Sequence, residues 1–184
     1  MAEYYLISQL PSLDGLGDGV PLPITEERFM ELCKSLSKDK LITELNKLTL
    51  VPPIIPVKSK STLIMEWDKC ERYLRLSLAK IRAEKLKKTF NLQNEYLPSE
   101  YVKIASNAVE IDNPLEAEKF LTAYRLDLLE SLRPMDSFSE DFIYYYYLKL
   151  KLLNRMKQFN VEQGQITYKN IYNSIINGKK TEAM

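Results

Sequence analysis

A row of side chains spaced three or four residues apart is the clearest candidate for chemistry in this sequence. It runs from Asp68 through Arg72, Arg75 and Ala79 to Arg82. Residues at this spacing share one side of an α-helix, and Asp68 can pair with Arg72 one turn further on. The row has two interpretations: a solvated face with surface ion pairs, or arginines that hold carboxylates of neighbouring helices or of a partner protein.

Four consecutive tyrosines, Tyr144 to Tyr147, are the second candidate. At about 100° per residue they circle a helix, so we expect some to face a neighbouring helix and some to face water. One interpretation is amphipathic packing with the hydroxyl groups at the rim of the core, and the other is an aromatic contact surface for a partner. The candidate protein-interface residues are therefore Arg72, Arg75, Arg82, Tyr144, Tyr145 and Tyr147.

Missing residue types argue against an enzyme. The sequence contains no histidine, which removes Ser-His-Asp and Cys-His catalysis and most zinc sites. It has only 5 glycines, few for loops that cradle phosphate groups. Cys33 and Cys70 fall on apolar faces of expected helices, which is typical of small buried side chains in a reducing compartment. We expect no catalytic residue, no metal and no cofactor.

The overall composition indicates one globular domain without a strong electrostatic preference. The chain has 184 residues, 45% of them hydrophobic, and a net charge of +1. We therefore expect a single helical domain over residues 1–184 that binds no nucleic acid and no small-molecule substrate directly. The sequence lacks the basic and apolar regions of a signal peptide and any apolar stretch of roughly eighteen residues. We therefore expect a cytoplasmic protein.

The arginine row lies on a long expected helix from Ser61 to Lys88. This stretch contains no proline or glycine, and its apolar residues recur three or four positions apart on one face. Ser61 is a suitable N-cap residue. This helix is expected to open the main helical body, which extends over residues 61–178, and a proline-rich connector over residues 51–60 leads into it.

The part of the chain before this connector is expected to be less regular. Residues 1–24 form an arm and a loop, with residues 4–10 extended against the helical body because they are aromatic and β-branched. Residues 25–50 are expected to form a pair of short antiparallel helices, with Thr25 and Ser37 as their N-caps.

The rest of the main body is expected to be helical. A helix is predicted from Pro98 or Ser99 to about Glu110. Asn113 with Pro114 and Glu116 forms a capping box, with proline at the first helical position, that opens a helix ending near residue 133.

The tyrosines lie on the next expected helix, over residues 139–160, for which Ser137 and Glu140 are a second candidate box. Gly164 is expected to break the chain before a final helix that ends at Gly178. The fold class is therefore all-α, an irregular bundle of about seven helices with long antiparallel helices and an extended N-terminal arm.

Four blocks of the sequence, taken together and in this order, resemble a known family. They are YYLISQLPSL, WDKCERYLRLSLAKIRAEKL, NPLEAEKFLTAYRLDLLESL and FIYYYYLKLKLLNRMKQFNVEQGQITYKNI, which cover most of the chain from Tyr4 to Ile171. The family is an uncharacterised bacterial helical family encoded beside subunits of V-type ATPases. It is in turn distantly similar to the C (or d) subunit of V/A-type rotary ATPases, an all-helical funnel on the membrane rotor ring that receives the central shaft.

The resemblance implies a non-catalytic role in coupling or assembling the central stalk of a bacterial V-type ATPase on its rotor. The implied partners are subunits of the central stalk or rotor ring. Through them the protein would be peripheral to the membrane, at the inner face of the plasma membrane. The resemblance assigns no individual binding residue, and this chain is much shorter than the three-lobed C subunit. The alternative is a generic helical protein–protein adaptor with a non-ATPase partner.

Overall fold

The computed structural model describes residues 2–16, 20–54, 59–91, 95–158 and 161–181. Within these residues the chain is all-α and contains eight helices and no strand, as the sequence predicts for the fold class. The helices are α1 (Ala2–Gln9), α2 (Glu26–Leu36), α3 (Asp39–Lys47), α4 (Thr62–Lys85), α5 (Ser99–Glu110), α6 (Pro114–Ser131), α7 (Glu140–Lys157) and α8 (Val161–Thr181).

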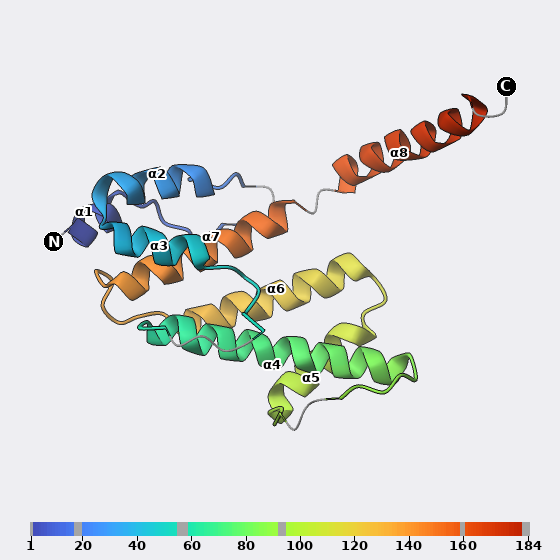
Figure 1. The fold of residues 1–184 in the computed structure, drawn as a ribbon, viewed down its shortest axis with the longest axis horizontal. Coiled ribbons are helices and arrows are strands. Elements are labelled where there is room, and N and C mark those ends of the chain that lie inside the picture. Colours follow the sequence, from blue (N-terminus) through green and yellow to red (C-terminus); the bar gives the residue numbers. More distant parts are fainter. Residues whose placement is uncertain (1, 17–19, 55–58, 92–94, 159–160, 182–184) are drawn as a thin grey trace.

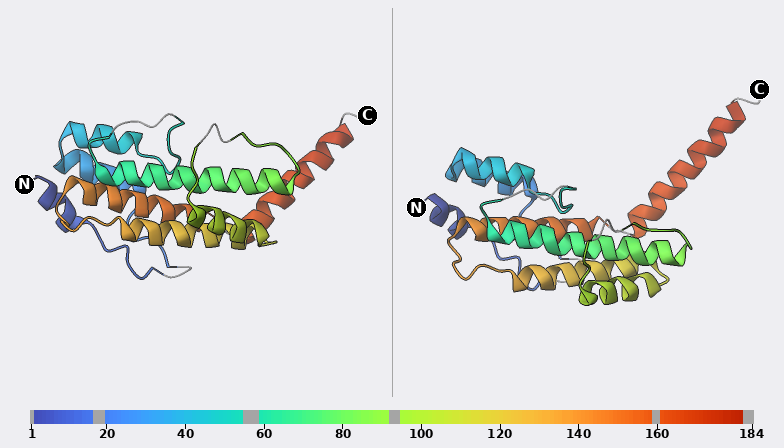
Figure 2. Two further views of the ribbon diagram at one scale, coloured as in Figure 1. Left: turned by 90° about the horizontal axis from the view of Figure 1, so that it is seen from below. Right: turned by 60° about the horizontal axis from the view of Figure 1, so that its bottom comes forward.

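Helix α7 is the most enclosed element of the bundle. Helices α2, α3, α4 and α6 all contact it, and α6 and α7 run antiparallel on either side of a short connection (Figures 1 and 2). Nearly every side chain from Ile143 to Leu152 is buried as a result. Helix α4, the carrier of the arginine row, lies along α5 and α7.

Several helix starts follow the cap residues predicted from the sequence. The side chains of Thr25, Ser61 and Asn113 each accept a hydrogen bond from a backbone N–H in the first turn of α2, α4 and α6. Pro114 occupies the first turn of α6, where its missing N–H costs nothing. The caps at Ser61 and Asn113 fix where α4 and α6 begin.

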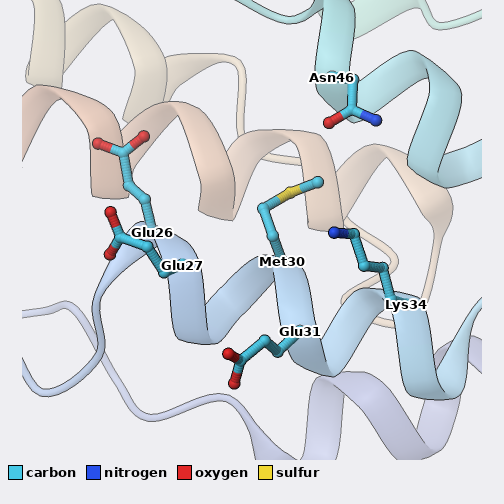
Figure 3. Close-up of a pocket in the computed structure, with 6 residues that line it drawn as sticks. All are labelled: Glu26, Glu27, Met30, Glu31, Lys34 and Asn46. Carbon is cyan, nitrogen blue, oxygen red and sulfur yellow. The ribbon is translucent and has the colours of Figure 1, made fainter.

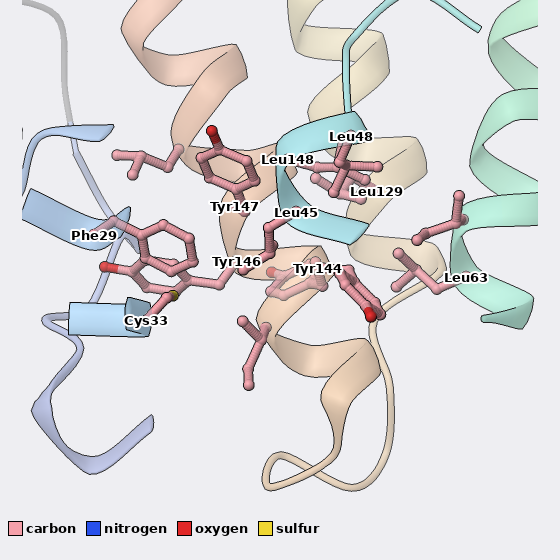
Figure 4. Close-up of a cluster of buried hydrophobic side chains, with 14 of the residues drawn as sticks. Phe29, Cys33, Leu45, Leu48, Leu63, Leu129, Tyr144, Tyr146, Tyr147 and Leu148 are labelled. Carbon is pink, nitrogen blue, oxygen red and sulfur yellow. The ribbon is translucent and has the colours of Figure 1, made fainter. Parts of the chain in front are cut away.

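The hydrophobic core consists of two clusters. The larger one joins α1, α2, α3 and α7 with the first turns of α4 and the last turns of α6, and Figure 4 shows part of it around Phe29 and the tyrosines. The smaller one lies where α4, α5 and α6 meet, and its buried residues are Leu74, Leu78, Tyr101, Ala105, Ala108 and Leu121. Both clusters use α4 and α6, so the two helices connect them.

The N-terminal segment is a helix, so the prediction of an extended arm over residues 4–10 is wrong. Leu6 is completely buried, and Ile7 and Leu10 pack against the same cluster. Leu6 and Ile7 belong to α1, Leu10 follows its last residue, and α1 contacts α2. Tertiary burial of a helical face therefore outweighs the local preference of an aromatic segment for extended structure.

Three further boundaries differ from the sequence-based prediction. Ser37 is the C-cap of α2 and does not cap α3, whose N-cap is Lys38. Ser139, rather than Ser137, caps α7 by accepting from the N–H of Phe142. Gly164 does not break the chain, because α8 begins at Val161 and continues past Gly178 to Thr181. Helix α8 extends away from the rest of the molecule (Figures 1 and 2).

Candidate functional site

The centre of the α4–α6 contact contains a completely buried carboxylate, Glu71. Three hydrogen bonds from two arginines satisfy it. Arg75 Nε donates to Glu71 Oε1 at 2.7 Å, and Arg125 Nε and Nη2 donate to Oε2 and Oε1 at 2.9 and 3.0 Å. A two-pronged guanidinium–carboxylate pair of this kind fixes both distance and orientation, so it aligns α4 with α6.

The same ionic contacts continue from α6 to α7. Arg125 Nη1 lies 3.7 Å from Glu118 Oε1, and Arg155 Nη2 of α7 lies 2.7 Å from that oxygen. The side chains Arg75, Glu71, Arg125, Glu118 and Arg155 thus form one alternating sequence of charges, which we call the ionic chain. It contains three guanidinium groups and two carboxylates, and it links α4, α6 and α7.

The ionic chain lies between the two hydrophobic clusters. On α4, Glu71 follows Trp67 of the larger cluster and precedes Leu74 of the smaller one. On α6, Arg125 is four residues from Leu121 and four from Leu129, which belong to different clusters. Sliding either helix by one turn would bury these charges against apolar side chains, which is costly.

Sequence reasoning missed Glu71 and Arg125, although each had a visible signal. Glu71 lies four residues after Trp67 and three before Leu74, in the middle of the apolar face of α4. Arg125 occupies the corresponding place on α6. A charged residue inside an apolar stripe indicates a buried, paired charge.

Two arginines of the row pair with carboxylates of this chain, and the third has no such partner among the described residues. Arg72 pairs with Glu95 through two contacts, of which the Nε–Oε2 distance is 3.0 Å, and it donates to the carbonyl of Ile54 at 2.7 Å. Arg75 belongs to the ionic chain. Arg82 is exposed and has no hydrogen-bond or ion-pair partner within the described part of the chain.

The predicted pair of Asp68 with Arg72 does not form, because Arg72 binds Glu95. Asp68 is half-buried and has no hydrogen-bond partner among the described residues. It lines a groove of about 440 Å³ with Glu44, Leu48 and Val51. Burial raises the pKa of Asp68 to about 6. A carboxylate that loses hydration without gaining a partner becomes easier to protonate.

The four tyrosines are core residues. Their exposed fractions are 3 to 6%, so the expectation that some of them face water is wrong. A helix in the middle of a bundle is surrounded by neighbours and buries all sides, which explains the difference. Tyr146 and Tyr147 stack on Phe29 with ring centroids 5.6 and 4.9 Å apart. In this arrangement Tyr144, Tyr145 and Tyr147 offer almost no side-chain surface to a partner.

A second cluster of polar side chains is centred on Lys149 of α7, which is itself buried while its partners Asp14 and Glu130 are exposed. Its ammonium group binds Asp14 at 2.5 Å, Glu130, and the hydroxyl of Tyr145 at 3.3 Å. Burial alone would lower the pKa of Lys149, but the hydrogen bonds to Asp14 and Glu130 raise it above its ordinary value. The lysine therefore stays charged. It ties the loop after α1 to the end of α6, and it lines a hollow of about 220 Å³.

The groove between α2 and α3 is open and lacks converging reactive groups. Its volume is about 400 Å³, and Glu26, Met30, Lys34 and Asn46 are among its lining residues (Figure 3). The Glu26 carboxylate already binds Lys151 at 3.0 Å and Asn154 at 2.7 Å. No nucleophile with an adjacent base lines this groove.

The described residues provide neither a cluster of metal ligands nor a helix that could span a membrane. The described residues contain no group of three or more His, Cys, Asp or Glu side chains able to hold a metal ion. None of the helices in the described part of the chain combines the length and the apolar character that crossing a membrane requires.

Comparisons with protein-family models, curated proteins and solved structures found no match to this chain.

Proposed function

We propose that this protein is a non-catalytic subunit or accessory protein of a bacterial V-type rotary ATPase. In this role it resembles the C (or d) subunit and couples or assembles the central stalk on the membrane rotor. The link to a rotary ATPase comes from the four sequence blocks that resemble the family. The structure adds a physical reason why this chain suits a mechanical role.

The observation that carries the proposal is the ionic chain across α4, α6 and α7. A coupling subunit must pass force from one end to the other without letting its helices slide. Sliding α4 against α6 would separate Glu71 from Arg125 inside an apolar environment, where breaking one partner of a buried pair typically costs about 3–5 kcal/mol. A bundle locked at mid-length in this way suits force transmission better than one held by apolar contacts alone.

We propose Arg82 as the member of the arginine row that contacts the partner. Arg72 and Arg75 are committed to Glu95 and Glu71 inside the chain, whereas Arg82 is exposed near the end of α4. Its guanidinium group suits a carboxylate on a stalk or rotor subunit. Reversing Arg75 would place a carboxylate beside Glu71 and disturb the fold, so Arg82 is the better test position.

The test is affinity purification of the tagged protein from its native cells, with quantitative mass spectrometry. Central-stalk or rotor-ring subunits in a fixed ratio to the bait would support a structural subunit. Their capture only during assembly, in substoichiometric amounts, would support an accessory factor. Absence of all V-type ATPase subunits in cells that express the complex would overturn the proposal.

Variants of Arg82 make this test specific. Arg82→Glu should reduce recovery of the partner several-fold while the circular dichroism spectrum and thermal midpoint stay unchanged, because the side chain is exposed. Arg82→Lys keeps the charge and should retain most of the recovery. The matched control is Arg28→Glu. Arg28 is an exposed arginine of α2 that, among the described residues, pairs with Glu31 alone. Equal loss with both reversals would argue against a specific contact at Arg82.

A helical adaptor for a non-ATPase partner is the second candidate. The observation that favours it is helix α8, whose described side chains from residue 164 to residue 175 are all exposed, several apolar ones among them. Recovery of one unrelated protein in fixed ratio, with no ATPase subunit, would favour this candidate.

A further inference from the structure

Helix α8 carries an apolar stripe that nothing in the described part of the chain covers. Tyr168, Ile171, Tyr172 and Ile175 are each at least half exposed, and the helix extends away from the body (Figures 1 and 2). The sequence of this helix is rich in β-branched residues, asparagine and glycine, which are weak helix formers. A lone helix of this length and composition is marginal in water, so contact with another surface would stabilise it.

We propose that the occupant of this stripe is the α8 helix of a second copy of this chain, packed antiparallel. The residues Gly164, Tyr168, Ile171 and Ile175 are separated by four, three and four positions. This is the spacing of a coiled-coil seam, in which one side of a helix keeps facing its partner. A two-fold axis between the copies lets the same surface serve both partners.

The charges along the stripe do not oppose pairing with a second copy. Lys169 is the only charged residue between positions 164 and 175, and it lies to one side of the seam. The residues that flank the seam are uncharged: Gln165, Thr167, Tyr172 and Ser174. Flanking charges set the choice of a different partner in coiled coils, and like charges would repel between identical helices. Here neither effect opposes self-association.

The sizes of the seam residues favour the antiparallel arrangement. When two copies are centred between residues 169 and 170, Tyr168 faces Ile171 of the second copy, and Gly164 faces Ile175. At both ends of the pair, Ile175 of one copy then lies in the empty space beside Gly164 of the other copy. Apart from its two chain neighbours and the nearby backbone of its own helix, a Cβ atom placed on Gly164 would meet no atom within 4 Å, so this space is open to the partner. A parallel pair would instead set glycine against glycine and tyrosine against tyrosine, which leaves a void beside a crowded layer. Antiparallel helix dipoles also attract.

The experiment is sedimentation equilibrium of the full chain over a wide concentration range, with circular dichroism on every variant. The wild-type protein should form a dimer whose stability does not fall in high salt, because its interface is apolar. Ile171→Glu should weaken the dimer roughly tenfold or more, since it places a carboxylate in an apolar seam. The control Asn173→Glu, on the opposite side of α8, should leave the dimer intact.

Gly164 provides the most specific readout. Gly164→Leu should increase the helix content of the monomer, because leucine is a better helix former than glycine, yet it should weaken the dimer by filling the space for Ile175. Adding Ile175→Ala should restore much of the affinity by reversing the order of large and small residues. A chain that stays monomeric at the highest concentration, or a dimer that Gly164→Leu strengthens, would overturn the proposal.

Discussion

Two carboxylates of α4, Asp68 and Glu71, lie three residues apart and are in opposite situations. Glu71 faces α6 and has no exposed surface, but three hydrogen bonds from Arg75 and Arg125 satisfy it. Asp68 faces the groove beside residues 48–53, is only half-buried, and has no partner among the described residues. The pKa of Asp68 is accordingly raised by burial.

In this protein the number of partners, rather than depth alone, decides what a buried charge does. Two guanidinium groups hold the deeper carboxylate, so it contributes alignment between α4 and α6. The shallower one loses hydration without compensation, so it costs stability at neutral pH. Three substitutions on α4 separate these situations.

The largest expected effect comes from Glu71→Ala. The substitution leaves Arg125 buried without its main partner, and losing one member of a buried ion pair typically destabilises a protein by about 3–5 kcal/mol. Urea unfolding followed by circular dichroism should report this loss as a lower midpoint with a similar slope.

The control for this prediction removes both charges. The double variant Glu71→Leu with Arg125→Leu should recover most of the lost stability, because an apolar pair of similar volume often replaces a buried ion pair at little cost. If Glu71→Ala alone costs less than about 1 kcal/mol, the ionic chain does not hold α4 and α6 in register.

An intermediate, pH-dependent effect is expected from Asp68→Asn. The folded-state pKa of about 6 lies above the ordinary value of 3.8. The folded protein therefore binds this proton more tightly than the unfolded chain does. The stability that comes from this shift is fully present below pH 4 and is lost as the pH rises through 6. At pH 7 to 8 the variant should thus be more stable than the wild type, by about 1 kcal/mol after allowance for partial exposure.

The measurement is the difference in unfolding free energy between Asp68→Asn and wild type from pH 4 to pH 8. The gain should vanish at the acidic end, where the wild-type carboxyl group is also neutral. Asp127→Asn, on the exposed side of α6, is the matched control and should show no pH-dependent gain. A gain of the same size at pH 4 and pH 8 would contradict a role for the charge.

The sequence was sufficient to predict helix starts and helix faces whose signals lie within a few neighbouring residues. Thr25, Ser61 and Asn113 cap their helices as predicted, because a cap needs only its own side chain and the next turn. The apolar spacing between Ser61 and Lys88 likewise predicted one apolar face on α4, and Trp67, Leu74 and Leu78 on that face are buried. Such features depend on contacts within a few residues.

The sequence did not reveal the features that depend on contacts between residues far apart in the chain. The helical form of α1 depends on burial of Leu6, and the burial of all four tyrosines depends on the four helices that surround α7. Glu71 pairs with Arg125, which lies 54 residues further along the chain. The spacing of residues within one helix does not reveal such a pairing. For the same reason Arg72 binds Glu95, 23 residues away, instead of the nearby Asp68.

The smallest effect is expected from Lys69→Ala, one residue after Asp68. Lys69 binds Glu66 at 3.3 Å, but both side chains are more than half exposed. Solvent and salt screen such a pair, and holding two long side chains together opposes the attraction. The thermal midpoint should therefore stay within experimental error of the wild type at 0.15 M salt, which differential scanning calorimetry can check. A clear drop in the midpoint would mean that exposure is a poor guide to the energetics of α4, and it would weaken the contrast between Glu71 and Asp68 on which the other two predictions depend.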